Sequence, residues 1–238
     1  MFTGIVECIG TVLDNNPYDD TESGGQGTTI TIGNCECILS DCHIGDSIAV
    51  NGICLTVVAF ETDTFKVGIS PETIKRTNVA SWTKGAKVNL ERAVSQDVRF
   101  GGHYVQGHID TVAKIVSREP EGNSIIFGFQ LRDQEYFKYI VEKGFICIDG
   151  TSLTVTQVDE LSQGGAFYIS MIKHTQDNVI MPLKKNGDDV NIEVDLTGKI
   201  IEKQIVLTLE NQISKKDSTL NTMIARIVEE KVKDYLSK

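Results

Sequence analysis

The feature that most constrains this chain is the repetition of its first half in its second. Residues 51–57 (NGICLTV) return about 100 positions later as residues 149–155 (DGTSLTV), and residues 84–91 (KGAKVNLE) return as residues 186–193 (NGDDVNIE). A weaker match relates residues 4–7 (GIVE) to residues 107–110 (GHID). Three matches in one order indicate a duplicated unit of about 100 residues, the size of a small domain. We therefore predict two similar domains, at residues 1–100 and 101–203, and a helical tail at residues 204–238.

The composition is that of a soluble globular protein. The 238 residues are 40% hydrophobic and 24% charged, which is enough apolar material for two modest cores. A net charge of -10 argues against nucleic acid as a partner and gives no reason to expect binding to an anionic membrane. No segment has the apolar length of a signal peptide or a membrane span, so we expect a cytoplasmic protein with six reduced cysteines.

Most of the chain is predicted to form short strands. They are rich in Val, Ile and Thr, are bounded by Gly, Asn and Asp, and number about six in each repeat. The expected ranges are 5–13, 28–32, 47–50, 54–60, 64–69 and 87–91, then 108–116, 124–131, 145–148, 153–158, 166–170 and 190–194. Short connections favour an all-β fold of two tandem six-stranded antiparallel Greek-key barrels. The four prolines are expected to lie outside the strands.

Three helical segments are expected. Ser70 before Pro71 predicts a short helix over residues 71–76, and a second is expected within residues 133–141. From about Ser218 to Leu236, apolar residues recur every three or four positions, which indicates an amphipathic helix of roughly five turns. This helix either packs on its own barrel or meets copies of itself in an oligomer.

A group of possible zinc ligands lies at Cys35, Cys37, Cys42 and His43. Its spacing matches none of the usual paired-cysteine zinc motifs. If residues 28–39 formed one strand, Cys35 and Cys37 would lie on the same face, as small core residues do. We therefore expect structural residues here, and no metal.

Several motifs resemble the riboflavin synthase family. They are Phe2-Thr3-Gly4-Ile5-Val6, Asn51 to Val57, Pro71-Glu72-Thr73, Gly101-Gly102-His103 with Gly107-His108, Lys143 to Val155, and Val190 to Asp195. The resemblance extends from residue 1 to about residue 201. It implies two lumazine-binding barrels and a C-terminal helix that holds a homotrimer, with active sites that combine barrels of neighbouring chains.

The resemblance also implies a transferase reaction. Two molecules of 6,7-dimethyl-8-ribityllumazine exchange a four-carbon unit and give riboflavin and 5-amino-6-ribitylamino-pyrimidinedione. No metal or redox cofactor is implied, because the methyl group at ring position 7 is conjugated to an electron-poor ring and can lose a proton. The protein has to position two substrates, supply acid and base groups, and exclude water.

By the same resemblance, each repeat provides one substrate site. The first site is expected to contain Gly4, Ile5, Val6, Cys54, Leu55, Thr56, Gly68, Ile69, Ser70, Pro71, Glu72 and Thr73. The second is expected to contain Gly107, His108, Ile109, Lys143, Ser152, Leu153, Thr154, Ser170, Met171, Ile172, Lys173, His174 and Thr175. The residues expected near the reacting carbons are Ser47, Cys54, His103, Ser152 and Asp195, with Phe2 as a wall over the rings.

Three of these residues have a structural alternative. Cys54 could be a small core residue, His103 a turn histidine, and Asp195 a strand-end cap. The two repeats also differ at matched positions, since Cys54 corresponds to Ser152 and residues 71–73 (PET) correspond to residues 173–175 (KHT). Such differences are expected if one bound lumazine donates the four-carbon unit and the other accepts it.

Two other classes of protein compete with the enzyme. A lumazine-binding or flavin-binding protein of the same fold would bind its ligand without turnover, but such proteins typically lose the polar residues of the second barrel. Here Lys143, Ser152 and Thr154 are retained. A flavin oxidoreductase would bring a glycine-rich nucleotide-binding turn, which the sequence lacks. The enzyme is therefore favoured.

Overall fold

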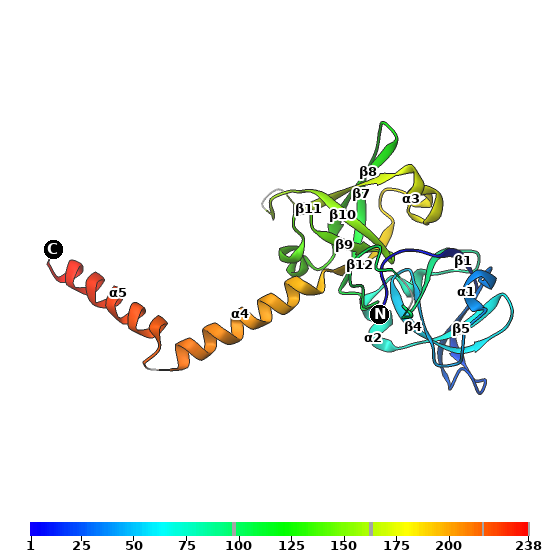
Figure 1. Ribbon diagram of the computed structural model, residues 1–238, viewed down its shortest axis with the longest axis horizontal. Coiled ribbons are helices and arrows are strands. Elements are labelled where there is room, and N and C mark those ends of the chain that lie inside the picture. Colours follow the sequence, from blue (N-terminus) through cyan, green and yellow to red (C-terminus); the bar gives the residue numbers. More distant parts are fainter. Residues whose placement is uncertain (97–98, 162–163, 216, 238) are drawn as a thin grey trace. The chain divides into compact units, whose positions relative to one another are not determined.

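The structure is a computed structural model that describes residues 1–96, 99–161, 164–215 and 217–237. Residues 1–195 form one unit that contains two closed barrels, coloured blue to cyan and green to yellow in Figure 1. The first barrel consists of β1 (Cys8–Asp19), β2 (Gly27–Gly33), β3 (Ser47–Val50), β4 (Ile53–Phe60), β5 (Thr64–Ile69) and β6 (Lys87–Arg92). The second consists of β7 (Thr111–Glu121), β8 (Ser124–Leu131), β9 (Phe145–Ile148), β10 (Thr151–Val158), β11 (Ala166–Ile172) and β12 (Asp189–Val194).

The two barrels have the same topology. Around the first barrel the order is β1-β2-β5-β4-β3-β6, and around the second it is β7-β8-β11-β10-β9-β12, with antiparallel neighbours throughout. The strands alternate between inward and outward residues, so that Leu55 and Val57 are buried while Thr56 is exposed. The predicted pair of six-stranded antiparallel barrels is confirmed.

Apolar side chains fill each barrel. The core of the first barrel includes Ile30, Phe65 and Leu90, all 1% exposed or less. In the core of the second barrel, the rings of Phe129 and Phe167 stack with centroids 5.3 Å apart. Each fully buried side chain of this size contributes roughly 1.5–3 kcal/mol relative to an exposed one.

Short helical segments connect the strands. The predicted helix α2 (Pro71–Arg76) is confirmed, and the Ser70 hydroxyl accepts a hydrogen bond from the Thr73 amide over 3.1 Å. The segment expected within residues 133–141 is the 3-10 helix η2 (Gln134–Tyr139). The short helices α1 (Glu36–Leu39) and α3 (Lys173–Asn178) and the 3-10 turns η1 (Val79–Ser81) and η4 (Met181–Leu183) were not predicted.

Two prolines correct the prediction that all four lie outside strands. Pro17 lies in β1 and Pro120 lies in β7. Both strands extend further than their apolar pattern suggests, and both prolines are exposed near the hairpin ends of these strands. Pro17 lies where the register between β1 and β2 shifts, so its missing N–H costs the ladder little.

The cysteine-rich segment is not a strand, which corrects the assumed shared face of Cys35 and Cys37. Cys35 precedes α1 and is fully buried, whereas Cys37 is on the helix and exposed. Burial raises the pKa of the Cys35 thiol to about 12. Cys42 packs against the core of the first barrel and His43 is exposed. Within the described ranges, no three His, Cys, Asp or Glu side chains are placed to share a metal ion.

The two barrels meet through matched turns. Asn51-Gly52 joins β3 to β4 and Asp149-Gly150 joins β9 to β10, each pair with positive φ at both residues. A methyl group at Gly52 would lie 2.7 Å from the Gly150 nitrogen, and the reverse substitution meets the Gly52 nitrogen at the same distance. Only glycine allows the turns to approach this closely.

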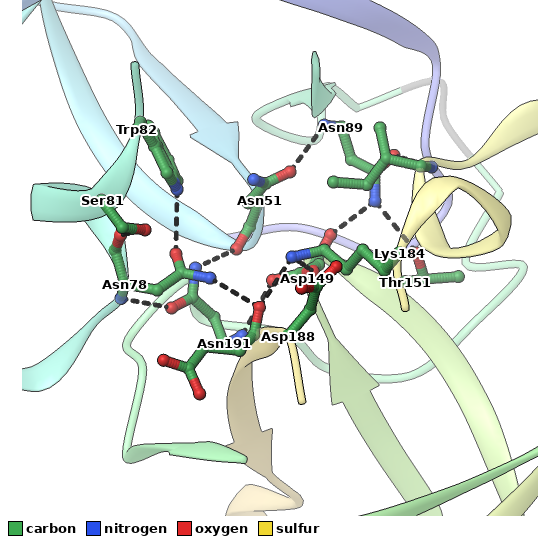
Figure 2. Close-up of polar contacts among 12 residues, drawn as sticks. Asn51, Asn78, Ser81, Trp82, Asn89, Asp149, Thr151, Lys184, Asp188 and Asn191 are labelled. Carbon is green, nitrogen blue, oxygen red and sulfur yellow. Dashed lines mark hydrogen bonds and ion pairs between the residues drawn. The ribbon is translucent and has the colours of Figure 1, made fainter. Parts of the chain in front are cut away.

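Buried asparagines link these turns to both barrels (Figure 2). The Asn89 side chain donates to the Asp149 carbonyl over 2.8 Å, and the Asn191 side chain donates to the Asn51 carbonyl over 3.0 Å. In return, the Asn89 amide oxygen accepts from Ile180 N–H and that of Asn191 accepts from Asn78 N–H, both over 2.9 Å. The duplication therefore provides a nearly symmetric set of polar contacts between the barrels. We call it the seam, and it contains Asn51, Asn78, Asn89, Asp149 and Asn191.

One corner of the seam breaks the symmetry. In the first repeat, Trp82 donates its indole N–H to Asn78 over 2.9 Å. At the matching corner of the second repeat, Lys184 lies 3.2 Å from the Asp149 carboxylate, which is 1% exposed. Burial raises the pKa of Asp149, and the Lys184 charge opposes that rise. A buried ion pair thus takes the place of a neutral contact.

Residues 196–238 form a second unit with two helices, α4 (Leu196–Ser214) and α5 (Thr219–Leu236). Helix α5 matches the predicted amphipathic segment, and Ser218 caps its first turn. Helix α4 was not predicted as a separate helix, and it begins before residue 204, where the helical tail was expected to start. The two helices carry exposed apolar side chains: Ile200, Ile201, Ile205, Val206, Leu207, Leu209, Ile213, Met223, Ile224, Ile227, Val228, Val232, Tyr235 and Leu236. Among the described helices, none is long and apolar enough to cross a membrane.

Candidate functional site

Each barrel presents a polar outer face at matching positions. On the first barrel, the face contains Cys54 and Thr56 on β4 and Gly68 and Ser70 at the end of β5. On the second barrel, the face contains Ser152 and Thr154 on β10 and Ser170 and Ile172 on β11. These residues point outward because their neighbours fill the barrel. The two faces therefore offer hydroxyl groups and open backbone to a polar heterocycle.

Three of the predicted chemical residues gather on the second barrel. His103 Nδ1 lies 2.7 Å from the Ser152 hydroxyl, and the His103 ring stacks on Phe145 with centroids 5.0 Å apart. Burial lowers the pKa of His103, whereas the charge of Asp195 opposes that fall. A neutral imidazole in contact with a hydroxyl can accept a proton, which is the property expected of a general base.

Cys54 and Ser47 lie on the first barrel. Cys54 is half-buried beside a small apolar cluster of Phe2, Ala49, Val105 and Cys147. Ser47 on β3 is the direct cross-strand partner of Thr56. It also lines a cleft of about 230 Å³ with Asp41, Cys42 and Arg92. The structure thus divides the five predicted chemical residues between the two barrels, two on the first and three on the second.

The segment that opens each repeat crosses to the other barrel. Phe2 and Val105 exchange backbone hydrogen bonds of 2.8 and 3.2 Å, which lays the two segments side by side. Beyond this bridge, the Gly4 carbonyl accepts from Ser152 N–H over 2.7 Å, and the Gly107 carbonyl accepts from Cys54 N–H over 2.8 Å.

This crossing corrects the expected grouping of site residues. Gly4 lies with Ser152 rather than with Cys54, and Gly107 lies with Cys54 rather than with Ser152. A methyl group added to either glycine would lie 2.6 Å from the Cβ of the facing residue. Sequence order suggested that each repeat completes its own site, but the backbone pairs the repeats crosswise.

Several predicted site residues are core residues. Phe2 is fully buried, so its ring packs between the barrels and cannot form a wall over a ligand. Four other side chains point into the barrels and could contact a ligand only through their backbone: Leu55, Ile69, Leu153 and Met171. Alternation along β4, β5, β10 and β11 places them on the inner face.

The remaining predicted residues are exposed or half-buried around the two faces. Around the first face these are Pro71, Glu72 and Thr73, together with His108 and Ile109 of the crossing segment. Around the second face they are Ile5, Val6, Lys143, Lys173, His174 and Thr175. Lys143 has a positive φ, and its N–H donates to the Val155 carbonyl over 2.8 Å. Lys173 forms an ion pair with Asp177, one helical turn further along α3.

Sequence reasoning missed three residues at these faces. Phe145, which stacks on His103, was placed in a strand but given no role. Glu91 and Glu193 are buried carboxylates that hold the crossing segments. The sequence did indicate these two glutamates, because each is the last residue of a repeated strand segment, VNLE or VNIE. A glutamate at a repeated position of a strand is unusual, since this residue is rarely buried.

A cavity of about 450 Å³ lies at one end of the first barrel. Ile30, Ile69, Val79, Trp82 and Lys84 contribute to its lining. None of the predicted chemical residues lines it. Its lining includes Ile69, which lies in the sequence between Gly68 and Ser70 of the first face.

Comparison with known proteins gives a consistent result. The family model of the lumazine binding domain matches residues 3–93 and again residues 106–195. The chain is 84% identical to the riboflavin synthase of Saccharomyces cerevisiae over the whole length of both proteins. It is 42% identical to the riboflavin synthase of Bacillus subtilis, an alignment that covers 89% of this chain and 93% of that protein.

Solved structures are similar as well. The crystal structure of LumP complexed with 6,7-dimethyl-8-(1'-D-ribityl) lumazine superposes with a TM-score of 0.69 at 25% identity, covering 82% of this chain and 99% of LumP. The LumP complex with riboflavin superposes with a TM-score of 0.71 at the same identity, covering 82% of this chain and all of LumP.

Proposed function

We propose riboflavin synthase activity for this chain, which belongs to the riboflavin synthase family with its two lumazine binding domains. Two molecules of 6,7-dimethyl-8-ribityllumazine exchange a four-carbon unit, and the products are riboflavin and 5-amino-6-ribitylamino-pyrimidinedione. The duplicated fold suits a reaction with two copies of one substrate, because each barrel presents one polar face.

The observation that carries this function is the polar second face. Ser152 and Thr154 point outward on β10, and His103 lies within hydrogen-bond distance of Ser152. A protein that only stores its ligand needs one competent face. A dismutase needs two faces and, in addition, a group that can accept the proton of an activated methyl.

We assign roles to the residues on this basis. The pair of His103 and Ser152 accepts the methyl proton directly or through a water molecule, and Asp195 supports the imidazolium that forms. Cys54 on the first face lies beside the reacting carbons of the other substrate. Thr56 and Thr154 hydrogen-bond the ring or the ribityl chain, whose many polar atoms need partners.

No metal or redox cofactor belongs to this proposal. The electron-poor lumazine ring itself stabilises the negative charge left by the methyl proton. The reaction needs no external oxidant or reductant, because riboflavin and the pyrimidinedione together contain the same atoms as the two lumazine molecules. The protein contributes orientation, proton transfer and exclusion of water.

The proposal includes a cytoplasmic homotrimer. The exposed apolar residues of α4 and α5 support association of these helices with copies of themselves. In a trimer, the first face of one chain would meet the second face of a neighbour, which would bring Cys54 and the His103–Ser152 pair to the same pair of substrates. The reduced cysteines and the acidic composition suit the cytoplasm.

An alternative function is binding of lumazine or flavin without turnover. The similarity to LumP complexes with the lumazine and with riboflavin supports it. One experiment separates the two functions. The purified protein is incubated with 6,7-dimethyl-8-ribityllumazine and no cofactor, with and without a chelator, and riboflavin is followed by fluorescence and mass spectrometry. Catalytic formation of riboflavin and the pyrimidinedione in equal amounts is expected, whereas stoichiometric binding without product would establish the carrier.

A further inference from the structure

Two buried glutamates lie at equivalent positions in the two barrels. Glu91 is on β6 and 5% exposed, and Glu193 is on β12 and 1% exposed. They end the repeated segments of residues 84–91 and 186–193. A buried carboxylate is costly to keep unless several donors meet it, so a pair retained through a duplication needs a physical explanation.

Each carboxylate holds the crossing segment at the start of its own repeat. One oxygen of Glu91 accepts from the Thr3 N–H over 2.6 Å and from the Thr3 hydroxyl over 2.7 Å, while the other accepts from the Gly4 N–H over 3.0 Å. Glu193 accepts from the N–H groups of Gln106, Gly107 and His108 over 2.7 to 2.9 Å. An ionised carboxylate accepts hydrogen bonds only, which matches three donors without conflict.

The segments held in this way support the opposite barrel. The Gly4 carbonyl accepts from Ser152 N–H, and the Thr3 carbonyl accepts from His103 N–H over 3.1 Å. A methyl group added at Gly102 would lie 2.0 Å from the Thr3 carbonyl oxygen, so the Thr3 backbone fixes the approach of the residue beside His103. The chain of contacts thus leads from Glu91 on the first barrel to the His103–Ser152 pair on the second.

The reverse chain leads from the second barrel to the first. Gly107, held by Glu193, accepts from Cys54 N–H over 2.8 Å, and a methyl group in its place would meet both Cys54 and the Phe2 ring. Glu193 is therefore connected to Cys54 as Glu91 is connected to Ser152.

We infer that Glu91 and Glu193 are positioning residues that act crosswise, each setting the geometry of the substrate face on the barrel to which it does not belong. Glu91 positions Ser152 and His103 through residues 3 and 4. Glu193 positions Cys54 through residue 107. The catalytic meaning of this arrangement rests on the proposed function, but the crosswise coupling itself can be measured without turnover.

The test uses Glu91→Gln and Glu193→Gln, with Glu121→Gln as control. Glutamine keeps the shape of glutamate but replaces one acceptor by an N–H₂ group, which faces a donor and breaks the arrangement. Glu121 is exposed at the turn between β7 and β8 and belongs to neither face. Full-length variants are treated briefly with iodoacetamide and with diethyl pyrocarbonate, and modification of each Cys and His is measured by peptide mass spectrometry. The exposed Cys37 and His43 serve as internal references.

We expect opposite patterns from the two variants. Glu193→Gln should raise the modification rate of Cys54 by about 3- to 10-fold, the factor expected when a local hydrogen bond is lost, and leave His103 unchanged. Glu91→Gln should raise the rate of His103 by a similar factor and leave Cys54 unchanged. Glu121→Gln should change neither.

The activity assay adds a second readout. Both variants should lower kcat more than they raise KM for the lumazine, because misplaced reacting groups cost more in the transition state than in binding. A protein that forms no riboflavin would refute the proposed function, yet the modification pattern would still test the crosswise coupling.

Two results would overturn the inference. In the first, each variant exposes the residue on its own barrel, which would make the coupling local. In the second, both variants expose Cys54 and His103 equally, which would indicate general loosening of the structure. If the glutamine variants do not fold, Thr3→Val removes the hydroxyl that donates to Glu91 and accepts from the Ile5 N–H, and Glu193→Asp shortens the other carboxylate by one methylene. These milder changes should give the same crossed pattern with smaller factors, and an uncrossed pattern would refute it.

Discussion

Replacing Lys184 by methionine tests the buried ion pair of the seam. The change keeps most of the apolar stem and leaves the Asp149 carboxylate, 1% exposed, without its counter-charge. Removing one partner of a buried pair costs about 3–5 kcal/mol. Asp149 still accepts a hydrogen bond from the Asn191 N–H over 2.8 Å, and the Lys184 side chain is 17% exposed. We therefore expect the free energy of unfolding to fall by about 3 kcal/mol, at the lower end of that range.

The assay is equilibrium unfolding in urea, followed by the fluorescence of Trp82, the only tryptophan, which lies in the same seam. With a slope of about 1–3 kcal/mol per M, a loss of about 3 kcal/mol should lower the urea midpoint by about 1–3 M at equal protein concentration. Lys114→Met is the matched control, because Lys114 pairs with Asp189 at the surface with both side chains largely exposed. Its loss should stay below about 1 kcal/mol.

The pH dependence of the loss identifies its cause. Burial raises the pKa of Asp149 and Lys184 opposes that rise, so Lys184→Met should raise this pKa further. A raised pKa means that the folded state favours the protonated acid over the ionised one. The stability lost by keeping Asp149 ionised is therefore greatest above the folded pKa, and it disappears as the pH falls toward the ordinary pKa near 3.9. The loss of unfolding free energy caused by Lys184→Met should therefore be smaller at pH 4.5 than at pH 7. It should also shrink in the double variant with Asp149→Asn, which restores the residue type of the first repeat. A deficit that is equal at both pH values and in the double variant would refute this reasoning.

Other predictions concern the site and the tail. Burial lowers the pKa of His103 in the folded state. The stability that neutral His103 contributes is therefore present above about pH 6.5 and is lost as the pH falls through the folded pKa. In urea unfolding, the wild type should lose more stability between pH 7.5 and pH 5 than His103→Gln does. Cys54→Ser should lower kcat and leave lumazine binding nearly intact, whereas Ser152→Ala should weaken both by about 1–3 kcal/mol; equal, mild effects would favour two interchangeable pockets. Ending the chain at Lys215 removes α5, and ending it at Asp195 removes both helices. We expect the chain that ends at Asp195 to form a smaller oligomer by light scattering, to bind lumazine and to turn it over poorly. An unchanged number of chains per particle would exclude a role of the tail in assembly.

The local pattern of the sequence predicts most of the strands, and the duplication predicts that both barrels share one topology. Helix α4 was missed because its apolar residues do not form one stripe. Ile201, Ile205 and Leu209 recur every four positions, but Ile200, Val206 and Leu207 lie on other faces of the helix and blur the amphipathic pattern. The crossing of Gly4 to Ser152 was missed for a different reason. It depends on hydrogen bonds between residues more than 80 positions apart, such as Thr3 with Glu91, and no local pattern encodes such a contact.

The crossing also explains why the repeats remain one unit. Each barrel can close its own six strands, yet the backbone that supports Cys54 belongs to the second repeat, and the backbone that supports Ser152 belongs to the first. A change in the segment at Gly4 is therefore felt at the face of the second barrel, and a change at Gly107 at the face of the first. The two faces can still differ in their own side chains, as Cys54 and Ser152 do, because those side chains are not part of the shared backbone contacts. Because each repeat supports the substrate face of the other through the segment at Gly4 or Gly107, the two faces can differ in side-chain chemistry while their backbone geometry stays coupled.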